Sequence, residues 1–322
     1  MKAILILALL AALACLAGLA LGAVPMSPRA IIAALLSPDA PGAAIVRNLR
    51  APRVVLAFVV GGSLGVSGAA LQALVRNPLA DPYLLGISGG AGLAAVVAIA
   101  LGFGGAWGVP AAAFLGGLGA IALVYRLSAV AGRRLDPHIL VLAGVVVSAF
   151  TGALITAVLT LSPAEQLRNA FLWLLGGFTA ASWSTVLVFA VYAVVPLLLL
   201  LGSARALDLL SLGEEPAQSL GLEAPRARRV VYLSTSLLTA ASVAVCGVVG
   251  FVGLVAPHAL RGLLGPLHRR LLPAVFLASG GFLVLADAAA RTVARPIELP
   301  VGVVTALVGV PLFAVLLRRT LR

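Results

Sequence analysis

The chain alternates long apolar segments with short polar ones along its whole length. A helix needs about 20 apolar residues to cross the hydrocarbon core of a bilayer, and most of these segments approach that length. The eighth segment is too short to cross alone. We predict ten membrane-spanning segments, at residues 3–23, 54–75, 84–103, 109–130, 139–160, 172–201, 230–252, 254–266, 271–290 and 299–317.

Composition supports a membrane protein made of helices. Hydrophobic residues make up 62% of the chain and charged residues only 10%, whereas a soluble domain carries roughly 25% charged residues. There is too little polar side chain to cover a globule in water, so lipid must surround most of the molecule. The predicted fold class is an all-α integral membrane protein, with residues 1–322 forming a single polytopic domain.

The first apolar segment is predicted to stay in the protein as a helix. It runs to Ala23, which is longer than the 7–15 apolar residues of a typical signal peptide. Cys15 and Cys246 both lie in apolar stretches, so the sequence predicts neither a disulfide framework nor a thiolate metal site.

The distribution of basic residues predicts the orientation. The net charge is +12, but the basic residues are scattered between apolar spans, which favours a membrane protein over a nucleic-acid binder. Placing the N-terminus inside puts most Lys and Arg in cytoplasmic loops, and the even number of spans then puts both termini inside. Most arginines left outside gather before span 2 and between spans 9 and 10, which suggests an acidic partner there.

The motif Arg50-Ala51-Pro52-Arg53 precedes the second span. Proline suits the first turn of a helix, so Pro52 predicts that the helix opens here. The planar guanidinium binds carboxylates through two hydrogen bonds, which makes Arg50, Arg53 and Arg291 candidates for contact with an acidic partner. The alternative is that these arginines snorkel, with their charged groups extended to the membrane interface.

A second motif, Arg76-Asn77-Pro78-Leu79-Ala80-Asp81-Pro82, follows the second span. Two prolines four residues apart predict a short, stiff turn at the cytoplasmic face. Asn77 and Asp81 can hydrogen-bond the backbone groups that the turn leaves free. The turn is either a gate at the cytoplasmic mouth of a passage or an ordinary helical hairpin.

Spans 5 and 10 carry small residues at helical spacing. The set consists of Gly144, Ser148, Thr151, Gly152, Gly302, Thr305 and Gly309. Such residues allow close helix packing, and small polar groups can also line a passage. Weak internal similarity, such as Arg-Val-Val at the start of spans 2 and 7, suggests that spans 2–5 and 7–10 form an inverted repeat.

The longest polar insertion lies at residues 202–229. Its segment 206–221 predicts two short helices joined at Gly213, with Glu214 and Glu215 near the start of a second helix that Pro216 opens and Gly221 closes. Two such helices form a compact knob suited to a cytoplasmic partner. The alternative, an amphipathic hairpin on the membrane surface, predicts basic residues, whereas the centre of this segment is acidic.

Catalytic chemistry is not indicated. The sequence has neither a metal-ligand cluster nor a phosphate-binding loop, so we expect no metal site and no nucleotide hydrolysis. His258 fits a packing role better than that of a ligand. Asp287 lies one turn before Arg291, which can neutralise it, although it could instead be a protonation site of an ion-coupled secondary transporter.

Five motifs together resemble one family. They are Arg-x-Pro-Arg, Gly-Ala-x-Leu-Gln before Arg-Asn-Pro-Leu-Ala-Asp-Pro, the Leu-Gly-Glu…Ala…Leu-Gly loop, Phe-Val-Gly-Leu-Val-Ala-Pro-His, and Glu-Leu-Pro-Val-Gly-Val-Val-Thr. In this order, over nearly the whole chain, they are similar to the permease subunit of type II ABC importers, which carry iron-siderophores, haem and vitamin B12.

The resemblance implies ten helices per subunit, including the short eighth one, and a homodimer with the pathway on its axis. It implies two cytoplasmic ATPase subunits that hold ATP and Mg²⁺, and a periplasmic or lipid-anchored solute-binding protein outside. This chain would bind no cofactor of its own. Its expected location is the bacterial or archaeal cytoplasmic (inner) membrane. The expected cargo is an iron chelate, with cobalamin as the alternative.

The resemblance also assigns roles to residues. Arg50, Arg53 and Arg291 match positions that dock the binding protein, and Asn77 and Leu79 match a cytoplasmic gate. A second gate falls on Asp136, Pro137 and His138, where the B12 importer has small hydroxyl residues. Segment 206–221 matches the helices that couple to the ATPase, with Gly213, Glu214, Glu215, Ala217, Leu220 and Gly221 as candidates; pathway candidates are Gly144, Ser148, Thr151, Gly302 and Thr305.

Overall fold

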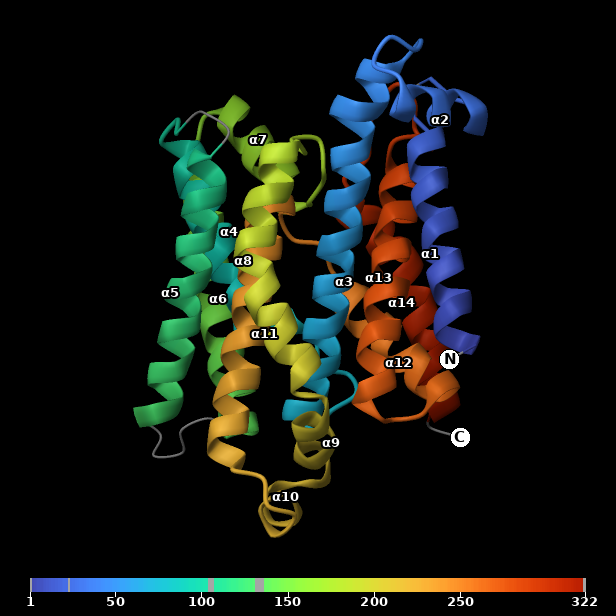
Figure 1. Ribbon diagram of the computed structural model, residues 1–322. Coiled ribbons are helices and arrows are strands. Elements are labelled where there is room, and N and C mark those ends of the chain that lie inside the picture. The colour runs from blue at the N-terminus through green and yellow to red at the C-terminus, as the bar shows by residue number, and fades with distance from the viewer. Residues whose placement is uncertain (1, 23, 104–106, 131–135, 321–322) are drawn as a thin grey trace.

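A computed structural model describes residues 2–22, 24–103, 107–130 and 136–320, and this part of the chain is helical throughout its regular structure (Figure 1). The helices are α1 (Lys2–Ala20), α2 (Pro28–Leu36), a π-helical turn η1 (Ile45–Arg50), α3 (Ala51–Leu74), a 3₁₀ turn η2 (Pro82–Leu85), α4 (Ile87–Ala100), α5 (Gly108–Val130), α6 (Pro137–Leu161), α7 (Ala164–Leu174), α8 (Trp183–Gly202), α9 (Ala204–Leu212), α10 (Glu214–Ser219), α11 (Ala224–Cys246), α12 (Val252–Leu264), α13 (His268–Ala290) and α14 (Val301–Thr320).

The predicted spans correspond to helices of the structure. Among the described residues, seven helical segments are long and apolar enough to cross a membrane: those of α1, η1–α3, α5, α6, α8, α11 and α13. Helices α4, α12 and α14 supply shorter apolar helices. The fold class is therefore confirmed. One boundary is wrong, because segment 172–201 is not one helix: α7 ends at Leu174, and Gly176, with φ +74°, lies in the connection before α8 begins at Trp183.

The start of the second span has an additional feature. Pro52 lies in the first turn of α3, as predicted, and a π-helical turn from Ile45 to Arg50 continues directly into that helix. In this turn the amide of Ala51 donates to the carbonyl of Val46, five residues earlier. Pro52 lacks an amide proton, and in a regular helix its ring would crowd the carbonyl four residues earlier. The wider π-helical turn before it relieves this crowding.

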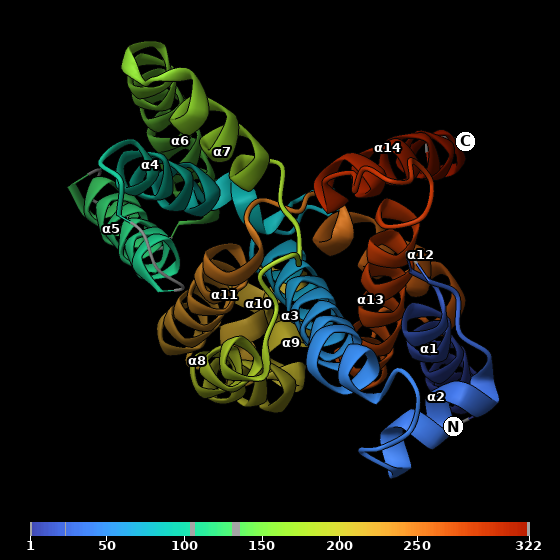
Figure 2. The same cartoon turned by 90° about the horizontal axis from the view of Figure 1, so that it is seen from above.

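Helices α3, α11 and α13 form the centre of the molecule, and Figure 2 shows α3 between the other two. Glycines let α3 and α13 approach closely. A Cβ atom on Gly65 would lie 2.2 Å from the Ser279 hydroxyl oxygen, and one on Gly280 would lie 2.7 Å from the carbonyl oxygen of Phe58. Close approach of this kind replaces the hydrophobic driving force that helices lack in lipid.

The two halves pair in an inverted pattern. Helices α3 to α6 correspond to α11 to α14: α3 packs on α13 as α11 packs on α5, and α3 packs on α12 as α11 packs on α4. The short helices α4 and α12 hold equivalent places. This pairing confirms the inverted repeat that the sequence suggested.

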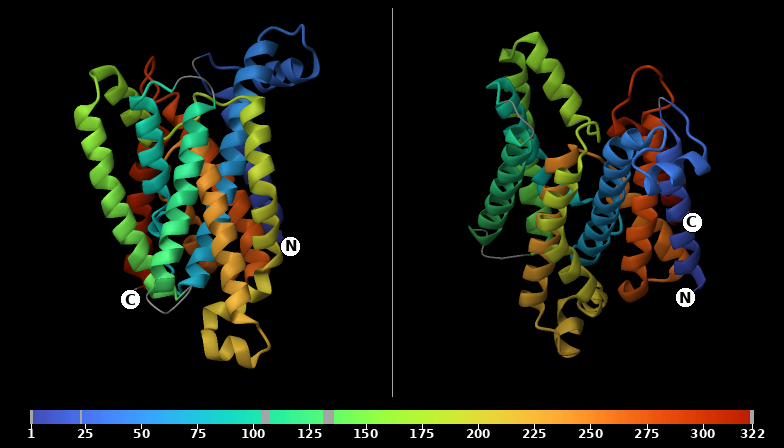
Figure 3. Two further views of the ribbon diagram at one scale, coloured as in Figure 1. Left: turned by 90° about the vertical axis from the view of Figure 1, so that its left-hand side faces the viewer. Right: turned by 45° about the horizontal axis from the view of Figure 1, so that its top comes forward.

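The molecule has two distinct ends. Helices α9 and α10 project from one end, here called the α9–α10 side, and α2 and α7 lie at the other, the α2–α7 side (Figures 1 and 3). Helix α1 begins and α14 ends on the α9–α10 side.

We predict that Gly68→Ala destabilises the protein, by about 1–3 kcal/mol, because the added methyl group overpacks the contact between α3 and α12. A Cβ atom there would lie 1.8 Å from the carbonyl oxygen of Gly253. Gly119→Ala on α5 is the matched control, since nothing lies within 4 Å of the atom it adds. Thermal unfolding of the solubilised protein measures both; equal midpoints would contradict the packing.

Candidate docking, gate and coupling sites

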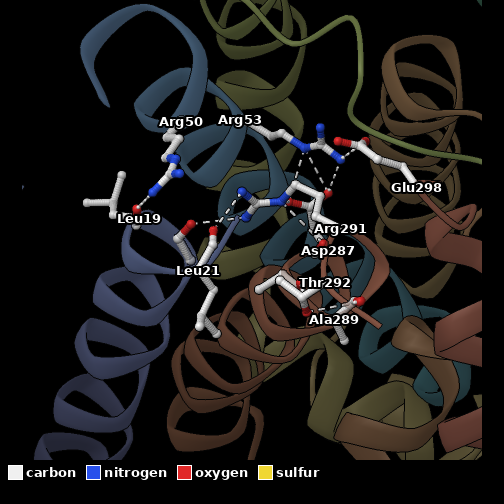
Figure 4. A network of polar contacts seen from close by, with 11 residues as sticks. Leu19, Leu21, Arg50, Arg53, Asp287, Ala289, Arg291, Thr292 and Glu298 are labelled. Carbon is white, nitrogen blue, oxygen red and sulfur yellow. Dashed lines mark hydrogen bonds and ion pairs between the residues drawn. The ribbon is translucent and has the colours of Figure 1, made fainter. Parts of the chain in front are cut away.

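An ion cluster on the α2–α7 side joins α3 to α13 (Figure 4). The Asp287 carboxylate, only 1% exposed, lies between two guanidinium groups: Arg53 Nη2 is 2.9 Å from Oδ1 and Arg291 Nε is 3.0 Å from Oδ2. Arg53 also binds Glu298, at 3.0 Å. The predicted pair of Asp287 and Arg291 is confirmed, and Arg53 gives the carboxylate a second guanidinium partner.

Arginines from this side cap the end of α1. Arg50 donates to the carbonyls of Leu19, at 2.7 Å, and Ala20, at 3.2 Å. Arg291 donates to the carbonyls of Gly18 and Leu21, at 3.0 and 3.1 Å (Figure 4). The last carbonyls of a helix have no partner within it, so these bonds satisfy them.

The capping contacts bear on the docking prediction. Arg50 and Arg291 are only 6% and 7% exposed, and their guanidinium groups are engaged inside the chain. Of the three docking candidates, Arg53 comes closest to the surface, with its side chain 13% exposed. In this structure Arg50 and Arg291 hold the end of α1, a role that neither docking nor snorkelling at the interface describes; docking itself stays a prediction.

The segment from Val75 to Asp81, here called the gate turn, has the side-chain bonds expected of it. Asn77 Oδ1 accepts from the amide of Leu79 at 2.9 Å, and Asp81 Oδ1 accepts from the amide of Tyr83 at 2.9 Å. Burial raises the pKa of Asp81 to about 6, and the hydrogen bond from the Tyr83 amide opposes that rise.

Gln72 supports the gate turn and was not identified from the sequence as a site residue. Its amide nitrogen donates to the carbonyl of Ala80 at 3.2 Å and to that of Leu254 in α12 at 3.4 Å. Arg261 of α12 donates to its side-chain oxygen. A buried glutamine inside an apolar span was the available signal, because such groups need polar partners in a membrane.

The two predicted gate segments meet at one cavity of about 320 Å³. Asn77 lines it from the gate turn, and Pro137 and His138 line it from the start of α6. Asp136 has a different place: its Oδ1 caps α6, accepting from the amide of His138 at 2.9 Å. Leu79 does not line this cavity and is partly exposed.

A larger cavity, of about 620 Å³, lies between α6 and the start of α12. Ser148, one of the pathway candidates, lines it together with Asp81 and Phe251.

The other four pathway candidates are packed between helices. The Thr151 and Thr305 hydroxyls donate to carbonyls of their own helices, at 2.8 and 3.1 Å. A Cβ atom on Gly144 or Gly302 would lie 2.0 or 2.3 Å from a neighbouring carbonyl oxygen. For Gly144, Thr151, Gly302 and Thr305 the packing alternative is therefore the one this structure supports.

Helices α9 and α10, joined at Gly213, form the projecting knob, here called the coupling element (Figure 3). Gly213 has φ +116° and ψ 171°, a conformation open almost only to glycine. After α10, the amide of Leu222 donates to the carbonyl of Ala217 and that of Gly221 to Gln218, a Schellman motif closed by Gly221. The two predicted short helices are confirmed, although α10 begins at Glu214 and not at Pro216.

The coupling element is fastened to the spanning helices by charged groups. Glu214 binds Arg228 of α11 at 2.9 Å. Asp208 of α9 caps α13, accepting from the amide of His268 at 2.9 Å and lying 2.7 Å from its Nδ1. Glu214 therefore has an internal partner. Glu215 and Leu220 are exposed, and Ala217 is buried.

The described part of the chain has ten apolar helices, eight of them in two inverted halves, and a cavity between the gate turn and the start of α6. These features define a polytopic membrane permease. The chain belongs to the FecCD transport family, whose model it matches over residues 8–319. This confirms the resemblance seen in the motifs: the chain is a permease of an ABC importer.

Similar proteins are named as permeases of import systems or as ABC transporters. The chain is 43% identical over 274 residues to the cobalamin import system permease protein BtuC of Halobacterium salinarum, covering 85% of this chain and 73% of that protein. It is 42% identical over 277 residues to the hemin transport system permease protein HmuU of Yersinia pestis, covering 84% and 82%. A solved metal-chelate type ABC transporter in an inward-facing conformation has a TM-score of 0.87 at 32% identity, covering 99% of both chains.

We predict that lowering the pH from 7.5 to 5 stabilises the wild-type protein more than it stabilises the Asp81→Asn variant. The pKa of Asp81 is raised in the folded state from 3.8 to about 6, so the folded state binds this proton more tightly and gains stability as the pH falls through 6. Asparagine keeps the capping oxygen without the charge. Unfolding midpoints across this range measure the effect, and parallel curves would contradict it.

We predict that Arg50→Leu loosens the end of α1 by removing charge-assisted hydrogen bonds, each worth about 1.5–3 kcal/mol. The half-buried Cys15 of α1 reports this opening, and its labelling by maleimide should become about tenfold faster. Arg29→Leu, on the exposed part of α2, is the control. An unchanged labelling rate in Arg50→Leu would show that the cap does not hold α1.

Proposed function

We propose that the chain is one half of a homodimeric, ATP-driven importer that moves an iron chelate from outside the cell to the cytoplasm. One observation carries this proposal: the coupling element projects from the same end of the molecule at which the gate turn and the start of α6 enclose a cavity. An ATPase that moved the coupling element would act next to the exit for the cargo.

The partners follow from this arrangement. Two ATPase subunits bind the coupling elements of the dimer through exposed groups such as Glu215 and Leu220, and ATP and Mg²⁺ bind to those subunits. The chain itself binds no cofactor and is not an enzyme. A periplasmic or lipid-anchored solute-binding protein docks on the α2–α7 side near Arg53, while Arg50 and Arg291 hold the end of α1 beneath it.

The α9–α10 side is the cytoplasmic one in this proposal. Lys2, Arg76 and Arg228 lie on this side, in agreement with the excess of Lys and Arg in cytoplasmic loops. Both termini are then cytoplasmic, and the membrane is the cell's cytoplasmic (inner) membrane. ATP changes access to the cavity because the two states of the ATPase bind the coupling element differently.

Relatives support the cargo class. HmuU is named for hemin and the solved neighbour for a metal chelate, and BtuC, named for cobalamin, marks the alternative cargo. Small polar residues in the larger cavity, such as Ser148, fit a passage that lets a bulky chelate through without holding it.

The test is uptake by proteoliposomes that contain the chain, its ATPase and its binding protein. We expect ATP, supplied on the side of the vesicle membrane that carries the ATPase, to drive uptake of a ferric siderophore or haemin. Cobalamin is the comparison. Vesicles without the ATPase, under an imposed proton gradient, are the control. Uptake in that control would contradict an ATP-driven importer, and uptake of cobalamin alone would replace the iron chelate as cargo.

A further inference from the structure

Arg76 occupies a backbone position that normally belongs to glycine. Helix α3 ends in a Schellman motif, in which the amide of Asn77 donates to the carbonyl of Gln72 at 3.1 Å and the amide of Arg76 to that of Ala73 at 3.4 Å. Arg76 is the left-handed residue of this motif, with φ +51°. An L-residue there costs roughly 1–2 kcal/mol that glycine avoids.

Strain of this kind points to a function for the side chain. Of the described residues, only Arg76 and Phe251 combine a side chain with a positive φ, and Phe251 lines the larger cavity. Residues in sparsely populated backbone regions persist where the rest of the structure gains from their side chains.

The Arg76 side chain reaches the coupling element. Its Nη1 lies 3.4 Å from the position that a Cβ atom on Gly213 would take, directly at the joint between α9 and α10. A guanidinium beside the last turn of α9 interacts favourably with the negative end of the helix dipole. Glu214, the acidic residue next to Gly213, already binds Arg228.

Arg76 also borders the gate cavity. It lines the space of about 320 Å³ together with Asn77 and His138. Arg76 is therefore next to the gate at its backbone and next to the coupling element at its guanidinium. A Cβ atom at position 213 would lie at ordinary van der Waals distance from Nη1, so the Arg76 side chain borders the joint itself.

We propose that Arg76 is a positioning residue that passes movement of the coupling element directly to the gate turn. The left-handed turn fixes the Arg76 backbone directly before Asn77 in the gate turn. Displacement at Gly213 therefore moves the Arg76 side chain, and through it the gate turn. This role rests on the proposed function, in which an ATPase moves the coupling element.

The experiment measures gate movement in the full complex with ATPase subunits in nanodiscs, without any solute. Cys15 and Cys246, the two native cysteines, are replaced by alanine, and Leu79→Cys in the gate turn reports its exposure to maleimide. The readout is the change in labelling rate between ATP with vanadate and no nucleotide. Arg76→Gly, Arg76→Ala and Arg76→Lys are compared with Arg226→Ala, which removes an exposed arginine elsewhere on the α9–α10 side.

We expect Arg76→Gly and Arg76→Ala to reduce the nucleotide-dependent change in labelling about fivefold, within the range of ordinary coupling between sites. Arg76→Lys restores most of it, and Arg226→Ala leaves it unchanged. Thermal stability moves the other way: Arg76→Gly is at least as stable as wild type because glycine relieves the strained turn. A residue with a purely structural role would not lose coupling while gaining stability.

Three outcomes would overturn the proposal. An undiminished response in Arg76→Ala would show that the side chain transmits nothing. A loss confined to Arg76→Gly would assign the effect to a more flexible turn. Loss of ATPase binding in the variants would make Arg76 a contact for the ATPase. Failure of the proposed function itself looks different, because wild-type protein would then neither bind the ATPase nor respond to nucleotide.

Discussion

The lack of water in the bilayer core determines much of this structure. Every amide and carbonyl at that depth must find a partner inside the protein, so each place where a helix stops needs a substitute for solvent. Guanidinium groups of Arg50 and Arg291 do this for the end of α1. Gln72 does it between the gate turn and α12. Polar side chains at the candidate sites thus also complete the hydrogen bonding of the backbone.

The sequence predicted features that depend on neighbours along the chain. Apolar length gave the spans, and local chemistry gave the Asn77 and Asp81 bonds, the pair of Asp287 and Arg291, and the joint at Gly213. A helix repeats every 3.6 residues, so contacts within a few residues follow from the order of residues alone.

Contacts between distant segments were beyond that reach. Arg53 meets Asp287 across 234 positions, and a positive charge with no local acid gives no sign of such a partner. The same limit affected the small residues of α6 and α14, where a glycine suits a tight contact and an open passage equally well. The neighbouring carbonyl oxygens at Gly144 and Gly302 show that these two glycines serve close packing. Arginines at helix ends were likewise open to two interpretations until their acceptors in α1 were known.

One tyrosine joins the two inverted halves. The Tyr83 hydroxyl, which precedes α4, donates to the carbonyl of Val249 at 3.0 Å and accepts from the amide of the same residue at 3.2 Å, just before α12. The backbone carbonyl and amide of Val249 are thus both hydrogen-bonded to the Tyr83 hydroxyl oxygen. A displacement of the η2 segment relative to the start of α12 would break both bonds. The contact therefore fastens the approaches to the two short helices, α4 and α12, to one another.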